Sequence, residues 1–191
     1  MTAHIRSITL AEFLKLPETK PANEYFEGQI YQRGIPQGKH STLQSRLVNT
    51  INAAGFPNRV AYAFPELRCT LGGRSIVPDV AVFQWAHIPF DVDGEIANIF
   101  ERAPDWMIEI FLPDQSPTRM IDNIAFSVSQ GTQVGWLIDP DEKAVVCFQP
   151  NQAPHVKRRA DESLPVPNFL NLELTVGRVF DWLKLGEGMR T

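Results

Sequence analysis

Two short runs of hydrophobic residues stand out along the chain, at 77–83 and 106–111. Each is nearly all apolar and rich in β-branched or aromatic side chains, which is typical of a strand buried on both faces of a sheet. Four other runs have a similar character, so the pattern also predicts strands at 60–64, 67–71, 134–140 and 144–149.

Other segments have the spacing of helices. In the segment after His40, and again in 118–130, apolar residues recur at every fourth position, which places them on one side of a helix. Gly131 then stands where a helix commonly ends. Thr9 is expected to cap a short helix, and residues 176–185 are expected to form a final amphipathic one. The two longer stripes are Leu43, Leu47 and Ile51, and Met120 and Ile124.

The order of these elements predicts an α+β fold. Strand, helix and strand between 106 and 139 imply a crossover connection and a locally parallel pair. Turns at Glu27–Gly28 and Gly72–Gly73 predict antiparallel hairpins beside it. We therefore expect a mixed β-sheet flanked by helices. The chain should form a single domain over 1–191, with an N-terminal helix and hairpin (7–33), a core (40–150) and a C-terminal meander and helix (151–185).

Each of the two buried runs carries one carboxylate, Asp79 in the first and Glu109 in the second. Two ionised carboxylates on neighbouring core strands would repel unless a cation lay between them. A hard divalent cation, Mg²⁺ or Mn²⁺, prefers such oxygen ligands. The alternative is that Asp79 caps a turn and Glu109 faces solvent on an edge strand. If the two share a metal-free site, at least one of them should have a raised pKa.

Three further residues are candidates for the same site. Glu66 should lie on a strand paired with the one that bears Asp79, but register decides whether the two share a face. Glu24 precedes the first hairpin turn, where it is either a third acidic ligand or an exposed side chain. His40 stands just before a helix, a position that favours a surface or capping residue over a catalyst.

Composition sets limits on the function. At 191 residues and 43 % hydrophobic content, the chain can bury a core without disulfides. Its 18 basic and 22 acidic residues give a net charge of −4, so there is no overall basic signature for nucleic acid, although a local basic patch would escape this sum. Cys69 and Cys147 are expected to be reduced structural thiols. With no apolar run long enough to span a membrane and no signal-peptide core, we expect a cytoplasmic protein.

In order along the chain, these residues resemble the Uma-type restriction endonuclease family, which is abundant in cyanobacteria. The resemblance implies a restriction-endonuclease-like core of the PD-(D/E)XK type and a Mg²⁺-dependent nuclease that acts on DNA. By this resemblance Asp79 and Glu109 are metal ligands, and Glu66 is an auxiliary acid. The ordered set that carries it is Glu24 to Gly28, His40, Glu66, Pro78-Asp79-Val80-Ala81-Val82, Glu109-Ile110 and Gly131-Thr132-Gln133-Val134-Gly135-Trp136-Leu137-Ile138-Asp139-Pro140.

The chain departs from the family pattern around the catalytic lysine. The position two residues after Glu109 is Phe111, and the serine expected next is Leu112. On the following helix, Asn123 stands where the family commonly has a lysine, and an amide can neither act as a base nor carry charge. Arg119, one helical turn earlier, could project a guanidinium to the site, but arginine is a poor base.

Three hypotheses remain open. The first is a metal-dependent DNA endonuclease, and the second is a catalytically impaired relative that acts as a binding or assembly module. The third is a structural or regulatory homo-oligomer in which the carboxylates are incidental. We also expect a homodimer, with the apolar segment from Trp85 to Phe90 and the C-terminal helix as contact surfaces.

Overall fold

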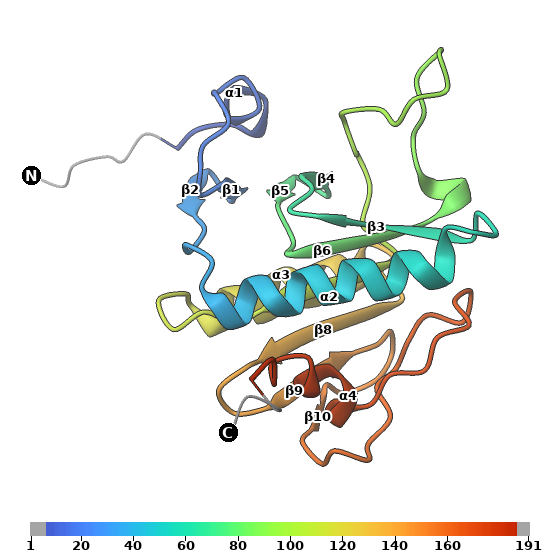
Figure 1. Ribbon diagram of the computed structural model, residues 1–191. Helices are drawn as coiled ribbons and strands as arrows, with labels where there is room; N and C mark the ends of the chain where they lie inside the picture. Colours follow the sequence, from blue (N-terminus) through green and yellow to red (C-terminus); the bar gives the residue numbers. More distant parts are fainter. Residues whose placement is uncertain (1–6, 187–191) are drawn as a thin grey trace, which may run out of the picture.

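A computed structural model describes residues 7–186 and shows two β-sheets with helices packed around them (Figure 1). The helices are α1 (Leu10–Phe13), α2 (Gly38–Gly55), α3 (Pro117–Ser129) and α4 (Val176–Asp181), with a short 3-10 helix η1 (Trp85–His87). The strands are β1 (Asn23–Phe26), β2 (Gln29–Gln32), β3 (Ala61–Pro65), β4 (Cys69–Leu71), β5 (Arg74–Ile76), β6 (Val80–Gln84), β7 (Trp106–Ile110), β8 (Val134–Asp139), β9 (Ala144–Phe148) and β10 (His155–Lys157).

The large sheet has six described strands in the order β10-β9-β8-β7-β6-β3. β7 and β8 run parallel and are joined through α3, as the strand, helix and strand pattern predicted. The neighbouring pairs β6–β7 and β8–β9 are antiparallel. The sheet is therefore mixed, and the predicted α+β fold class is confirmed.

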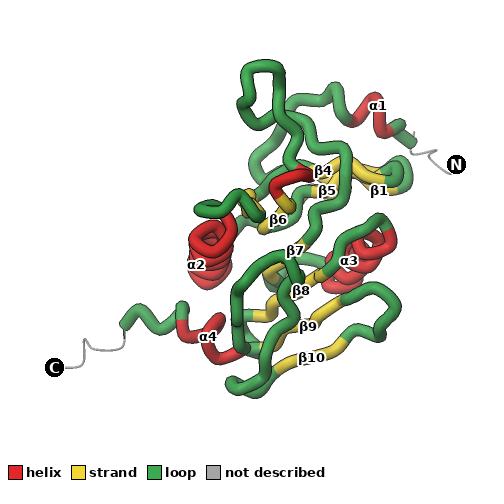
Figure 2. Tube along the Cα trace, turned by 90° about the vertical axis from the view of Figure 1, so that its right-hand side faces the viewer, coloured by secondary structure: helices red, strands yellow, loops and turns green. Residues whose placement is uncertain are grey.

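Helices cover both faces of this sheet, and Figure 2 shows α2 and α3 on opposite sides of its strands. Successive side chains of a strand point to opposite faces, so each strand contributes to two cores. The core on the side of α2 and α4 contains Leu47, Trp106, Ile108, Trp136 and Val179. The core on the side of α3 contains Ala81, Phe83, Met107, Ile124 and Leu137. Burial on both faces explains why these strands read as continuous apolar runs.

The small sheet has the order β2-β1-β5-β4 and includes both predicted hairpins. Glu27 and Gly28 turn β1 into β2, and Gly72 and Gly73 turn β4 into β5, with positive φ at all four residues. After β5 the chain crosses directly into β6 of the large sheet. This connection places the end of β5, in the small sheet, beside the start of β6, in the large one.

Some predicted boundaries were wrong. α2 begins at Gly38, so His40 lies in its first turn and is buried, rather than standing before the helix at the surface. The last helix ends at Asp181 rather than at Leu185, because the N–H groups of Leu183 and Lys184 bond to carbonyls three residues back, as in turns. Ser116 takes the N-cap position of α3, but its hydroxyl contacts Thr118 instead of a backbone N–H.

Cys69 and Cys147 are free and buried, in agreement with two structural thiols. Burial raises the pKa of the Cys147 thiol to about 12. Among residues 7–186, no helix is both long and apolar enough to cross a membrane.

Candidate active site

Asp79 and Glu109 lie side by side where the two sheets meet. Val80 of β6 pairs with Ile108 of β7 in antiparallel register, and continuing this register by one residue places Asp79 beside Glu109. Asp79 precedes β6 by one residue, and its Oδ2 accepts a hydrogen bond of 2.7 Å from the backbone N–H of Ile110. Both carboxylates are 1 % exposed, so the alternative in which Glu109 faces solvent is wrong.

Glu24 of β1 brings a third carboxylate to the same place from the small sheet. Its Oε1 accepts a hydrogen bond of 2.8 Å from the backbone N–H of Val77, just before Asp79. Its Oε2 accepts one of 3.2 Å from Nδ2 of Asn123 on α3. Glu24 is therefore buried and held by hydrogen bonds from two sides. The alternative in which its side chain is exposed is wrong.

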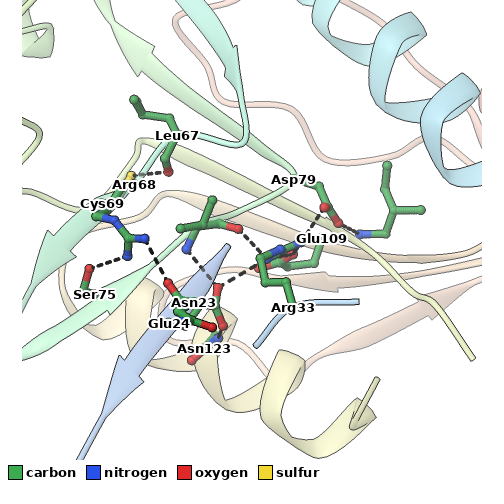
Figure 3. A network of polar contacts seen from close by, with 12 residues as sticks. Asn23, Glu24, Arg33, Leu67, Arg68, Cys69, Ser75, Asp79, Glu109 and Asn123 are labelled. Atoms are coloured by element: carbon green, nitrogen blue, oxygen red, sulfur yellow. Dashed lines mark hydrogen bonds and ion pairs between the residues drawn. The ribbon is translucent and has the colours of Figure 1, made fainter. Parts of the chain in front are cut away.

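The guanidinium of Arg33, just after β2, lies among these three carboxylates (Figure 3). Nη2 donates to Asp79 Oδ1 and, at 3.2 Å, to Glu109 Oε2. Nη1 is 3.3 Å from both Glu24 Oε1 and Glu109 Oε2, and also donates to the carbonyl of Val77. The carboxylates are therefore separated by a cation, as expected, but in this structure the cation is the guanidinium of Arg33.

Burial and charge set the protonation of the cluster. Burial raises the pKa of Glu109 well above its usual value, and the nearby Asp79 and Glu24 raise it further, although Arg33 acts in the opposite sense. Burial also opposes ionisation of Asp79, but Arg33, His40 and the Ile110 N–H together hold its pKa below the usual value. Of the two carboxylates, Glu109 is thus the one whose pKa burial raises, in line with the expectation for at least one of them.

His40 lies against Asp79 from the first turn of α2. Its Nε2 is 3.0 Å from Asp79 Oδ1, but without the direction of a hydrogen bond, and neither ring nitrogen has a hydrogen-bond partner among the described residues. The side chain is only 2 % exposed. Buried polar groups are nearly always paired, so the Nδ1 of His40, which has no partner among the described residues, marks the site as one that can take a further ligand.

The structure places Glu66 and Arg119 outside the buried cluster. Glu66 follows β3 in a left-handed turn, where its N–H donates to the carbonyl of Asp79 while its side chain is exposed. Glu66 is therefore in the turn rather than on a strand paired with Asp79. The guanidinium of Arg119 lies 4.0 Å from the ring centroid of Tyr31, over its face.

Two cavities open on either side of the connection between β2 and α2. One, of about 440 Å³, is lined by Glu24, Glu109, Arg119 and Asn123. The other, of about 620 Å³, is lined by His40, Glu66, Arg68 and Asp79. Arg33, Gly34 and Ile35 line both, so this connection lies between the two cavities.

Comparison with known proteins now bears on this arrangement. A family model, Uma2, described as "Putative restriction endonuclease", matches residues 10–177. The chain belongs to the Uma2 family. A solved structure of a "putative nuclease" from Anabaena variabilis is 54 % identical over 92 % of this chain and 99 % of its own, with a TM-score of 0.90. None of the curated proteins compared with this chain matches it.

These matches confirm the predicted family and the restriction-endonuclease-like fold, and they support a nuclease-like function for this Uma2 chain. Among residues 7–186, no set of three or more His, Cys, Asp or Glu side chains is arranged to hold a metal ion. The chemistry of Glu24, Asp79 and Glu109 nevertheless fits a hard divalent cation, because all three are carboxylates. Their present arrangement fits the guanidinium of Arg33 instead.

Arg33 is the residue of this Uma2 site that sequence reasoning missed. The requirement for a cation between buried carboxylates was evident, and an arginine directly after the first hairpin was available to meet it. That Arg33 reaches Glu109, 76 residues away, depends on how the hairpin packs against the large sheet. Periodicity along the chain does not specify such packing.

Proposed function

We propose that this protein is a divalent-metal-dependent DNA endonuclease that hydrolyses phosphodiester bonds with Mg²⁺ or Mn²⁺. The observation that carries the proposal is the convergence of three buried carboxylates, from β1, the start of β6 and β7, beside two open cavities. Membership of a family described as restriction endonucleases supports DNA as the substrate.

In this proposal Glu24, Asp79 and Glu109 hold the metal. A bound divalent cation lowers the pKa of its water and neutralises charge on the phosphate. His40 contacts Asp79 and keeps that carboxylate oriented, while the N–H of Ile110 holds its other oxygen. Arg119, at the wall of the smaller cavity, supplies a guanidinium suited to bidentate contact with a DNA phosphate.

A second candidate function is a catalytically impaired binding module, and the residues around Glu109 favour it. Phe111 and Asn123 occupy the two positions where the family resemblance leads us to expect a lysine. The amide of Asn123 is engaged with Glu24 and carries no charge. A protein of this kind would keep the fold and bind DNA or a metal without cutting.

Incubation of the purified protein with supercoiled, linear and single-stranded DNA, with and without Mn²⁺, separates the two candidates. We expect metal-dependent cleavage that falls at least about a hundredfold in Asp79→Asn, because loss of a ligand removes the metal's contribution. Asp93→Asn is the matched control, since it makes the same change at an exposed aspartate of the 88–100 loop. DNA binding without cleavage in any of these reactions would favour the binding module.

A further inference from the structure

We propose that Arg33 acts as an internal counter-ion that holds the metal position in the resting protein and must leave it before a divalent cation can bind. This inference rests on the proposed function, because it concerns the same three carboxylates. Arg33 thereby makes the metal-free site stable and also holds it closed.

The contacts of Arg33 are those of a bound cation. Its side chain is 9 % exposed and lies within 3.3 Å of carboxylate oxygens from Glu24 and Glu109, besides its bond to Asp79. Its Nη1 also donates a hydrogen bond to the backbone carbonyl of Val77. Carboxylate and carbonyl oxygens are the donors that Mg²⁺ and Mn²⁺ prefer, so the guanidinium and a metal would use the same atoms.

The histidine beside Asp79 provides a second observation. His40 is buried, its Nε2 lies 3.0 Å from Asp79 Oδ1 and its Nδ1 has no hydrogen-bond partner among the described residues, and it lines the larger cavity together with Asp79 and Arg33. A buried imidazole in this state is expected to gain a partner when the site is loaded. Such a partner can be a metal-bound water or the metal itself, and either can enter once the guanidinium has moved.

The surroundings of Arg33 allow it to leave. The connection 33–37 is neither helix nor strand, and cavities of about 440 and 620 Å³ flank it. Ile35 is 75 % exposed, so outward movement of this segment loses little buried apolar surface. The guanidinium therefore has solvent-filled space on two sides into which it can turn.

The first test uses the unmodified protein and trypsin, which cuts after arginine. Arg33 is buried in the resting state, so cleavage at the Arg33–Gly34 bond should be slow. Mn²⁺ should raise that rate by at least about tenfold, because a two-state opening equilibrium responds to ligand affinity in this way. Cleavage after the exposed Arg158 is the internal control and should not respond. Protection or no change at Arg33 would overturn the proposal.

The second test measures Mn²⁺ affinity by electron paramagnetic resonance. Removal of a positive charge in contact with the carboxylates should make Arg33→Met bind Mn²⁺ at least about tenfold more tightly than wild type. Arg33→Lys keeps the charge and should stay closer to wild type. An unchanged or weakened affinity in Arg33→Met would mean that Arg33 organises the site rather than competing for it.

The outcomes distinguish this inference from the nuclease proposal. Tighter Mn²⁺ binding by Arg33→Met, or exposure of Arg33 by Mn²⁺, without DNA cleavage would support the exchange and contradict the nuclease. Metal-dependent DNA cleavage with Arg33 protected by Mn²⁺ would support the nuclease and contradict the exchange. Absence of Mn²⁺ binding in both wild type and Arg33→Met would overturn both.

Discussion

At the scale of single residues, the site is a small set of buried charges that depend on one another. Glu24, Asp79 and Glu109 are each desolvated, and Arg33 is the cation that contacts all three. Breaking a buried ion pair by removing one partner is strongly destabilising, because a charge is left without compensation. A conservative neutral replacement is therefore more informative here than truncation to alanine.

Glu109→Gln should stabilise the protein increasingly as the pH rises. The folded-state pKa of Glu109 lies above its unfolded value, so its contribution is complete below the unfolded pKa and is lost as the pH rises toward the folded pKa. That loss amounts to about 1.4 kcal/mol per pH unit, and a neutral amide does not undergo it. Urea denaturation from pH 5 to pH 8 should show wild type losing stability relative to the variant.

The exposed Glu95 provides the matched control, because Glu95→Gln makes the same chemical change without burial. Its stability should follow that of wild type across the range. Parallel curves for Glu109→Gln and wild type would contradict a raised pKa at Glu109.

Asn123→Lys should raise metal-dependent DNA cleavage if the rest of the site is competent. Asn123 lines the same cavity as Glu109 and contacts Glu24, so a lysine there would bring an ammonium to the carboxylates. General-base and water-positioning groups are worth about 10²–10⁴-fold in rate, and initial cleavage rates would show a gain of that size. Asp79→Ala in the same background should abolish it. An unchanged rate in a wild type that already cuts well would mean that Arg119 or another cation has taken over the role of the lysine.

At the scale of elements, periodicity predicted most of what the structure shows. The apolar runs at 77–83 and 106–111 correspond to β6 and β7 and the residues next to them. The helical stripe of Leu43, Leu47 and Ile51 faces the core from α2. Asp79 and Glu109 could be predicted because a charge in an apolar run is conspicuous. Glu24 remained ambiguous, His40 was assigned to the surface and Arg33 was overlooked, because their burial arises from packing of the small sheet against the large one. Packing between two sheets leaves no local pattern in the amino-acid sequence.

The approach of α3 to β8 depends on Gly135. A Cβ at this residue would lie 2.3 Å from Cγ2 of Ile124, well inside contact distance. Gly135→Ala should therefore destabilise the fold by about 1–3 kcal/mol, a typical cost of overpacking a core. Thermal unfolding should show a lower Tm, and adding Ile124→Leu, which moves the branch from Cβ to Cγ and so removes the clashing Cγ2, should restore part of it.

Gly38→Ala is the control for this prediction. Gly38 lies at the start of α2, and a Cβ at this position would meet nothing within 4 Å, so the substitution should leave the Tm unchanged or raise it slightly. A Gly135→Ala protein as stable as wild type would show that α3 can shift away from the sheet at little cost.

At the scale of the whole molecule, some large apolar side chains remain exposed to solvent while others are buried. The loop 88–100 stands out from the body in Figure 1, and it carries Val92 at 99 % and Ile99 at 70 % exposure. Phe90 is 45 % exposed, whereas Ile88 is buried. α4, the other predicted contact, already packs Val176, Val179 and Phe180 into the core of its own chain. Four exposed large apolar side chains therefore lie together on this one loop, namely Phe90, Val92, Ile96 and Ile99.

The sequence predicted a homodimer with contacts through Trp85 to Phe90 and the C-terminal helix. We now expect the contact to extend along the loop 88–100. Sedimentation equilibrium should show association of wild type at micromolar concentrations, and Val92→Asp with Ile99→Asp should weaken it by at least about tenfold, because each charge would have to be buried without a partner. Leu14→Asp is the control, since Leu14 is a similarly exposed apolar residue beyond α1. A monomer at all concentrations would remove the prediction.

The contacts that assemble the cluster join residues far apart in the chain. Arg33 bonds Asp79 and Glu109 across 46 and 76 positions, and Asn123 reaches Glu24 across 99. Contacts of such long range form late in folding, and synthesis proceeds from the N-terminus. A chain still on the ribosome thus carries Glu24 and Arg33 before Asp79, Glu109 and Asn123 have been made. The last pieces of the site are made only when α3 has emerged, so no nascent fragment shorter than that can hold the assembled cluster.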